Sequence, residues 1–196
     1  MNRFVLMLFL VPALAGCKGK KNKPEISATN FFPVPTYIRG ELKRLDTASV
    51  PFTKIEIMND RLDTAQITNK DVPQYAKDFL DLPDIASSNV KDDYEVSHLY
   101  DDIQGAFVFN FITKEAHPLR EENITVDPQP NAQGKNDIKS IYAKLEADSA
   151  NGSVTKILLW EAGKGFYTTN IFDAPGKIEQ IKKVQILWQR PEGQRK

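Results

Sequence analysis

The chain carries few side chains that could do chemistry. Its 196 residues include one cysteine, Cys17, and two histidines, His98 and His117. Without a second thiol, an intrachain disulfide and redox chemistry through a resolving cysteine are excluded. Neither histidine belongs to an HExxH or cysteine-rich pattern, so a zinc site lacks its usual ligands. We expect no metal and no cofactor, with His98 packed in the core or at its rim and His117 solvated in a loop.

Acidic and glycine-rich patterns also favour simple structural interpretations. Asp92–Asp93 and Asp101–Asp102 flank the strand-like segment YEVSHLY. Calcium binds carboxylate oxygens at about 2.3–2.6 Å, whereas a strand of that length separates the two pairs by roughly 20–30 Å. The segment Gly163–Gly165 lacks the first glycine and the hydroxyl of a phosphate-binding P-loop, so it predicts a hairpin turn.

None of the motifs that mark a catalytic nucleophile is present. The sequence contains no GxSxG, no SxxK and no Cys/His pair, although a triad assembled from distant residues stays open. Trp160 and Trp188 are expected in neighbouring strands, where they pack in the core or at a sheet edge. We therefore favour a protein that is not an enzyme and keep a hydrolase with an unrecognised site as an alternative.

The position of Cys17 indicates where the protein works. Met1–Arg3 is a short basic start, and the apolar run FVLMLFL follows it. This run fits the roughly 7–15 residues of a secretory signal peptide and is shorter than the roughly 18 needed to span a bilayer. Residues 1–16 are therefore predicted to be a signal peptide. Residues 17–30, with KGKKNK directly after the cysteine, are predicted to be a flexible basic tether.

The quartet LAGC, which ends at Cys17, resembles the lipobox of bacterial lipoproteins. The resemblance implies that Cys17 is acylated and becomes the mature N-terminus, held in the membrane by its acyl chains. Lys18 follows the cysteine where an aspartate commonly retains such proteins in the inner membrane. The same resemblance therefore favours the outer membrane, facing the periplasm or the cell surface. The segments NFFPVPTYIRGEL and VTKILLWEAGKGF also look like those of uncharacterised Gram-negative envelope lipoproteins, a likeness that implies no active site.

Composition indicates one nearly neutral globular domain behind this tether. The chain has 26 basic and 26 acidic residues, and 41% of its residues are hydrophobic. Residues 31–190 suit a single domain and residues 191–196 a disordered tail. A nucleic-acid partner would require a basic patch that this sequence does not show. The expected partners are the membrane, through acyl chains on Cys17, and an envelope protein or glycan.

The first half of the domain shows both helix and strand patterns. Apolar residues at helical spacing predict a helix over residues 36–45, and FTKIEIM and RLDTAQIT predict a hairpin around Asn59. A second helix is expected after a cap at Thr68 or Asn69. The predicted order over residues 36–81 is helix, strand, strand, helix.

The second half shows the patterns of strands. YEVSHLY and GAFVFNFIT alternate, and the latter has apolar residues on both faces, which predicts a central strand. ENITVDP predicts a short edge strand, and residues 128–136 predict a loop. Residues 138–147 fit either a helix or a strand. We favour the strand because Asn151-Gly152 joins it to VTKILLW. The predicted fold is α+β: the helix-strand-strand-helix layer packs on an antiparallel β-meander of about six strands.

Six ring-bearing residues share one predicted face of the first two meander strands, and they are candidates for ligand contact. They are Tyr94, His98, Tyr100, Phe107, Phe109 and Phe111. Such rings usually fill a core, although a carrier that encloses an apolar ligand between sheet and helices would use the same face. Phe109 is expected to be buried by neighbours on both sides.

Three triplets, DTA twice and DSA once, resemble the acceptor for O-glycosylation of envelope proteins in some Gram-negative bacteria. The resemblance implies modification at Thr47, Thr64 and Ser149, whereas the same dipeptides also serve as ordinary turns and caps. The leading functional hypothesis is a lipid-anchored, non-catalytic module whose sheet face or loops contact another envelope component. A carrier of an apolar ligand and a hydrolase are the alternatives.

Overall fold

The helix α1 (Val34–Asp46) forms because its apolar side chains recur at helical spacing. Pro35 lies in its first turn, where proline is tolerated, and Ile38 and Leu42 are buried on one face. The helix spans the predicted residues 36–45. The structure is a computed structural model that describes residues 32–59, 61–87 and 89–188. The signal peptide, Cys17, the tether and the C-terminal tail lie outside these residues.

The predicted hairpin and the segment after it follow α1. Strands β1 (Phe52–Met58) and β2 (Arg61–Ile67) pair in antiparallel register. The second helix is divided into three short pieces, η1 (Asn69–Asp71), α2 (Val72–Tyr75) and α3 (Lys77–Leu80). The Thr68 backbone N–H donates to the Asp71 carboxylate, 2.9 Å away, and this bond fixes the first turn at the position where a cap was expected.

A short helix, η2 (Lys91–Asp93), then leads into seven consecutive strands, each antiparallel to the next. They are β3 (Tyr94–Asp101), β4 (Ala106–Thr113), β5 (Leu119–Pro130), β6 (Asn136–Ser149), β7 (Gly152–Glu161), β8 (Gly165–Asp173) and β9 (Gln180–Trp188). The predicted turn at Gly163–Gly165 joins β7 to β8. Only glycine fits at Gly165, because a Cβ there would lie 2.5 Å from the Ile186 carbonyl oxygen.

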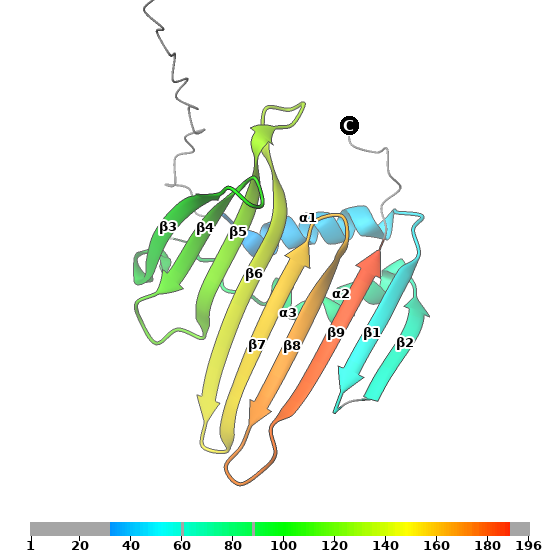
Figure 1. The fold of residues 1–196 in the computed structure, drawn as a ribbon, viewed down its shortest axis with the longest axis vertical. Coiled ribbons are helices and arrows are strands. Elements are labelled where there is room, and N and C mark those ends of the chain that lie inside the picture. Colours follow the sequence, from blue (N-terminus) through cyan, green and yellow to red (C-terminus); the bar gives the residue numbers. More distant parts are fainter. Residues whose placement is uncertain (1–31, 60, 88, 189–196) are drawn as a thin grey trace, which may run out of the picture.

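The predicted α+β fold with a six-strand meander is wrong. All the strands form one nine-stranded sheet in the order β2-β1-β9-β8-β7-β6-β5-β4-β3 (Figure 1). The β1–β2 hairpin does not belong to a separate layer, because β1 pairs with β9, with Phe52 opposite Trp188. This pairing satisfies backbone groups of β9 that an edge strand would leave open. Alternation of apolar and polar residues along a sequence predicts that a segment is a strand, but it does not predict which other strand it pairs with.

Two predictions about individual strands are also wrong. The segment ENITVDP lies in β5, which lies between β4 and β6 and is not an edge strand. Strand β4 is next to the edge strand β3 and is not covered on both faces: Ile112 is 47% exposed. Phe109 is therefore half-buried, and Phe111 of the same strand takes the fully buried position.

One face of the sheet, called the inner face here, packs against the helices and holds the core. Phe79 of α3 inserts edge-on against Trp160 and Phe166, with ring centroids 5.6 and 5.5 Å away. Trp188 joins the same cluster, 5.5 Å from Trp160. The opposite, outer face is the one that Figure 1 presents, with α1, α2 and α3 behind the sheet. The fold is thus a single sheet with helices on one side.

Candidate functional site

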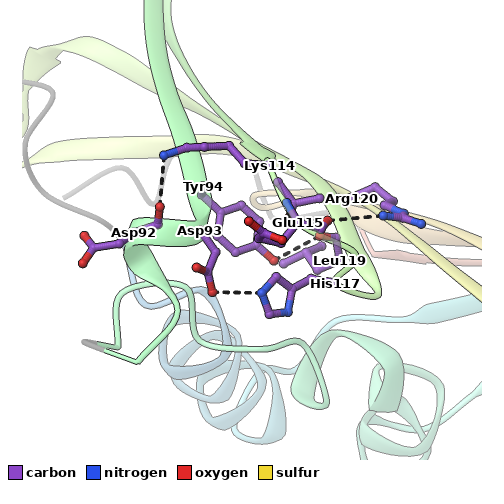
Figure 2. A network of polar contacts seen from close by, with 9 residues as sticks. Asp92, Asp93, Tyr94, Lys114, Glu115, His117, Leu119 and Arg120 are labelled. Atoms are coloured by element: carbon purple, nitrogen blue, oxygen red, sulfur yellow. Dashed lines mark hydrogen bonds and ion pairs between the residues drawn. The ribbon is translucent and has the colours of Figure 1, made fainter.

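The densest polar cluster lies where β3 begins and the β4–β5 turn passes beside it (Figure 2). His117 Nε2 lies 2.9 Å from Asp93 Oδ2, and each side chain is 35% exposed. The backbone N–H of Lys114 donates to the Asp93 carbonyl, and its ammonium donates to the Asp92 carbonyl. These bonds hold the turn against η2. His117 is therefore paired and half-buried, not solvated as expected.

Tyr94 forms the apolar wall of this cluster. Its ring stacks on the imidazole of His117 with centroids 6.1 Å apart, and its hydroxyl donates to the Leu119 carbonyl at 3.0 Å. Burial, with a smaller contribution from the negative charge of Glu122, raises the pKa of Tyr94 to about 12. The phenol therefore stays neutral at ordinary pH and serves as a hydrogen-bond donor.

Glu122 lies beneath this cluster on the inner face. It has no exposed surface, and its cross-strand neighbours are Phe111 and Ala143. In the part of the chain that the structure describes, neither carboxyl oxygen has a hydrogen-bond partner. Burial first, and the charge of Asp84 second, raise the pKa of Glu122 to about 8. The side chain is thus a neutral carboxylic acid at pH 7, because an isolated buried carboxylate is costly.

The cluster is a local network of hydrogen bonds. The Asp93 carboxylate orients the imidazole of His117 through their 2.9 Å contact. Within residues 32–59, 61–87 and 89–188, Asp93 is the one side chain hydrogen-bonded to His117, and no three His, Cys, Asp or Glu side chains converge as metal ligands. The arrangement shows proton-binding groups without an adjacent nucleophile among the described residues.

The candidate ligand-facing rings are divided between the core and the surface. Tyr94, Phe107 and Phe111 are buried, at 4%, 4% and 1% exposure. Tyr100 and Phe109 are half-buried, and His98 is exposed while its ring stacks on Phe109 at 6.0 Å. His98 therefore lies outside the packed core, against the half-buried ring of Phe109, so of the two expected positions, core or rim, the core is excluded. Of the buried rings, Tyr94 and Phe111 belong to the main core cluster under the helices.

The outer face carries a band of aliphatic and tyrosine side chains. Tyr142, Leu159 and Tyr167 are direct cross-strand neighbours and are half-buried. They alternate along their strands with the inner-face core residues, so they point away from the helices. Three further outer-face residues are more exposed, Leu62 at 68%, Leu99 at 58% and Ile112 at 47%, but they lie on the edge strands β2 and β3 and on β4, apart from this central row. We call Tyr142, Leu159 and Tyr167 the outer band.

A separate groove of about 520 Å³ lies on the outer face between β1, β9 and the β8–β9 loop. Ile57 and Ile181 belong to its apolar lining, and Ile178, which is 91% exposed, stands at its side. Glu179 and Lys183 add one charge of each sign. The groove offers an apolar surface with a charged rim.

The remaining sequence-predicted residues are dispersed. Thr64 is exposed on β2, while the exposed Thr47 and Ser149 hydroxyls donate to the carbonyls of Arg44 and Gly152. The two aspartate pairs lie at opposite ends of β3, where the Asp101 carboxylate accepts from the backbone of Ile103 and Gln104. Cys17 lies outside the described residues.

Sequence reasoning missed Glu122 and the Asp93–His117 pair. A signal for Glu122 is present, since it alternates with Ile124 and Val126 and therefore shares their inward face. The pairing of Asp93 with His117 carries no such signal, because it depends on how the β4–β5 turn folds back over η2.

Comparison with family models, curated proteins and solved structures finds no significant match for this chain. Among the described helices, none combines the length and apolar character needed to cross a bilayer.

Proposed function

We propose that the protein is a lipid-anchored, non-catalytic binding module of the bacterial cell envelope. Acyl chains on Cys17 hold it in the outer membrane, and residues 17–30 tether the folded domain. The lipobox-like LAGC, which directly follows an apolar export signal, supports this placement. Two or more acyl chains suffice for stable attachment, so the adjacent lysines need not anchor the protein.

The observation that carries the binding role is the contrast between the two faces of the sheet. Both faces carry large apolar side chains, but within residues 32–59, 61–87 and 89–188 the helices lie on the inner face alone (Figure 1). Exposed contiguous apolar surface on a protein commonly marks a site of interaction, and tyrosine is enriched in interfaces. Tyr142, Leu159 and Tyr167 stand together at the centre of the sheet. The outer band is therefore the proposed contact surface for another envelope protein.

The membrane part of the proposal is tested by Cys17→Ser in the full-length precursor. We expect loss of acylation and accumulation of unprocessed precursor. Signal-peptide cleavage is followed by gel mobility and acylation by incorporation of a labelled fatty acid. Mature, membrane-attached protein in this variant would contradict the lipobox interpretation.

The binding part is tested in cells by placing a photo-crosslinking amino acid at Tyr167 and, as a matched control, at Phe172 of the same strand. Phe172 is 44% exposed but lies on the inner side, because five positions of alternation separate it from Tyr167. We expect one discrete crosslinked species from position 167 and none from position 172. Leu159→Ser should abolish that species without lowering the melting temperature by more than a few degrees.

Equal crosslinking from both positions, or a crosslink insensitive to Leu159→Ser, would contradict the outer band as the contact surface. Because the acylation test is independent, either part of the proposal can fail alone. The carrier hypothesis gains no support from the candidate ligand-facing rings, since three of the six are already packed.

A further inference from the structure

Glu122 occupies an unusual position for an ionisable side chain. It is completely buried on the inner face of β5, between Phe111 and Ala143 of the adjacent strands. Both of its oxygens lack a partner among the described residues. Burying even a neutral polar group without hydrogen bonds costs about 1–3 kcal/mol in proteins, and an unpaired charge costs more. This position therefore tolerates the acid and strongly disfavours the carboxylate.

The cover over this half of the sheet includes the segment 81–87, between α3 and η2. Leu82 and Ile85 are 4% and 1% exposed and belong to the same core cluster as Phe111 and Ile124. The hydrogen bonds of Asp84 are local: its carboxylate accepts from the Ala86 backbone N–H, and its carbonyl accepts from the Ser87 backbone N–H. Apolar packing of two side chains thus makes a major contribution to holding this segment on the sheet.

Asp84 lies in segment 81–87 on an exposed side, and its negative charge acts on the Glu122 carboxyl. From β3, Tyr94 is a neutral phenol within electrostatic reach of Glu122, and Asp93, the residue before it, is paired with His117. Within the described chain, no ion pair joins a lysine or arginine to Glu122. A proton lost from Glu122 would therefore add a buried negative charge near that of Asp84 while the cover is closed.

We propose that Glu122 and segment 81–87 form a proton-operated latch, in which the protonated carboxyl keeps the segment packed on β5 and loss of the proton releases it. Two forces act in the same direction on release. The carboxylate gains hydration only when the segment lifts, and its repulsion of Asp84 falls as the two separate. Lifting the segment exposes the inner face around Phe111 to water. This conformational device is independent of the proposed outer-face contact.

The latch makes a specific prediction for the pH dependence of opening. The Glu122 carboxyl has a pKa of about 8 in the closed state and an ordinary value near 4.5 when hydrated. Opening therefore releases a proton over this interval. The opening constant should rise about tenfold per pH unit between these two values and level off above the higher one. Between pH 6 and pH 8 the expected increase is about 50-fold, because the rise already flattens as the pH reaches the closed-state pKa.

Hydrogen exchange of the Ile85, Ala86 and Ser87 amides, corrected for the intrinsic effect of pH, measures this constant. Wild type should show the rise, whereas Glu122→Gln should give a flat profile because its side chain does not titrate. Glu121→Gln is the matched control: it alters the neighbouring carboxyl on the outer face and should retain the wild-type profile. A flat profile in wild type, or the same slope in Glu122→Gln, would overturn the latch.

A second measurement does not require the variant to fold. The infrared carbonyl stretch of a protonated carboxylic acid should be present in folded wild type at pH 7 and should disappear on titration to pH 10. Absence of this band at pH 7 would show that Glu122 is already ionised while closed and would overturn the proposal.

Discussion

The inner face of the sheet has two halves that are stabilised in different ways. Under α1–α3, strands β7–β9 present Trp160, Phe166 and Trp188 to Phe79, and this half is aromatic. Strands β3–β5 also carry buried rings, Phe107 and Phe111, but they add the buried carboxyl of Glu122 near the Asp93–His117 pair, and we call this the polar half. The stabilisation from packed aromatic rings does not depend on pH, because the rings do not titrate. The stabilisation around a buried carboxyl does depend on pH, because the carboxyl can lose its proton. The stability of one half of the inner face is thus expected to be independent of pH, and that of the other half to depend on the protonation of Glu122.

The largest effect is expected in the aromatic half, from Phe79→Ala. Phe79 is fully buried and contacts two rings, so the variant leaves a cavity and should lose about 3–5 kcal/mol of unfolding free energy. Chemical denaturation followed by circular dichroism measures the loss. Phe172→Ala, at a ring that is 44% exposed, serves as the control and should lose about 1 kcal/mol or less. Equal losses would mean that the two rings are equally packed.

The next largest effect is a pH dependence of the unfolding free energy that arises from Glu122 in the polar half. Glu122 has a pKa raised from 4.5 to about 8, so the folded protein holds a proton that the unfolded chain releases. Its stabilising effect is complete below about pH 4.5 and is lost as the pH rises through about 8. We expect wild type to lose about 2–4 kcal/mol relative to Glu122→Gln across this interval. Denaturation curves at matched pH values measure the difference, and parallel pH profiles would contradict it.

A smaller loss is expected from Tyr94→Phe. The variant keeps the ring stacked on His117 but removes the hydroxyl that donates to the Leu119 carbonyl. An unpaired carbonyl in a buried position costs about 1–3 kcal/mol, and we expect a loss in the lower part of this range. The melting temperature of purified protein reports it. Tyr100→Phe, in the half-buried position on the same strand, is the control and should be nearly neutral.

The smallest effect is expected from Asp93→Asn. The pair with His117 is 35% exposed on each side, and ion pairs of such exposure contribute about 0–1 kcal/mol. The variant keeps the shape of the side chain, so the melting temperature should change by no more than a few degrees. A loss as large as that of Phe79→Ala would show that the pair fixes the β4–β5 turn and that the polar half is the less tolerant one.

Local patterns predicted the elements better than their arrangement. The spacing of Ile38 and Leu42 predicted the first helix, and Asn59 predicted the turn of the first hairpin. The Asn151-Gly152 turn favoured a strand over a helix for the residues of β6. The position of β1 beside β9 could not be predicted, because pairing between distant segments depends on which edge is free after the meander has formed.

The candidate site was less predictable than the fold. Glu122 followed an alternating pattern, but its charge favoured a surface position, and its burial depends on the cover contributed by Leu82 and Ile85. Because Pro118 follows it, His117 was predicted to be a solvated loop residue. Its contact with Asp93 arises from the turn between two strands, which no spacing in the sequence encodes.

The pairing of β1 with β9 also bears on the order of events during synthesis. Strand β1 cannot pair with β9 until β9 has been synthesised. Contacts between segments so far apart in the sequence are also slow to form. Trp188, which packs against Phe52, lies at the end of β9. The β1–β9 pairing therefore cannot form until all nine described strands have been synthesised, whereas the β1–β2 hairpin and the pairs from β3 to β8 can form earlier.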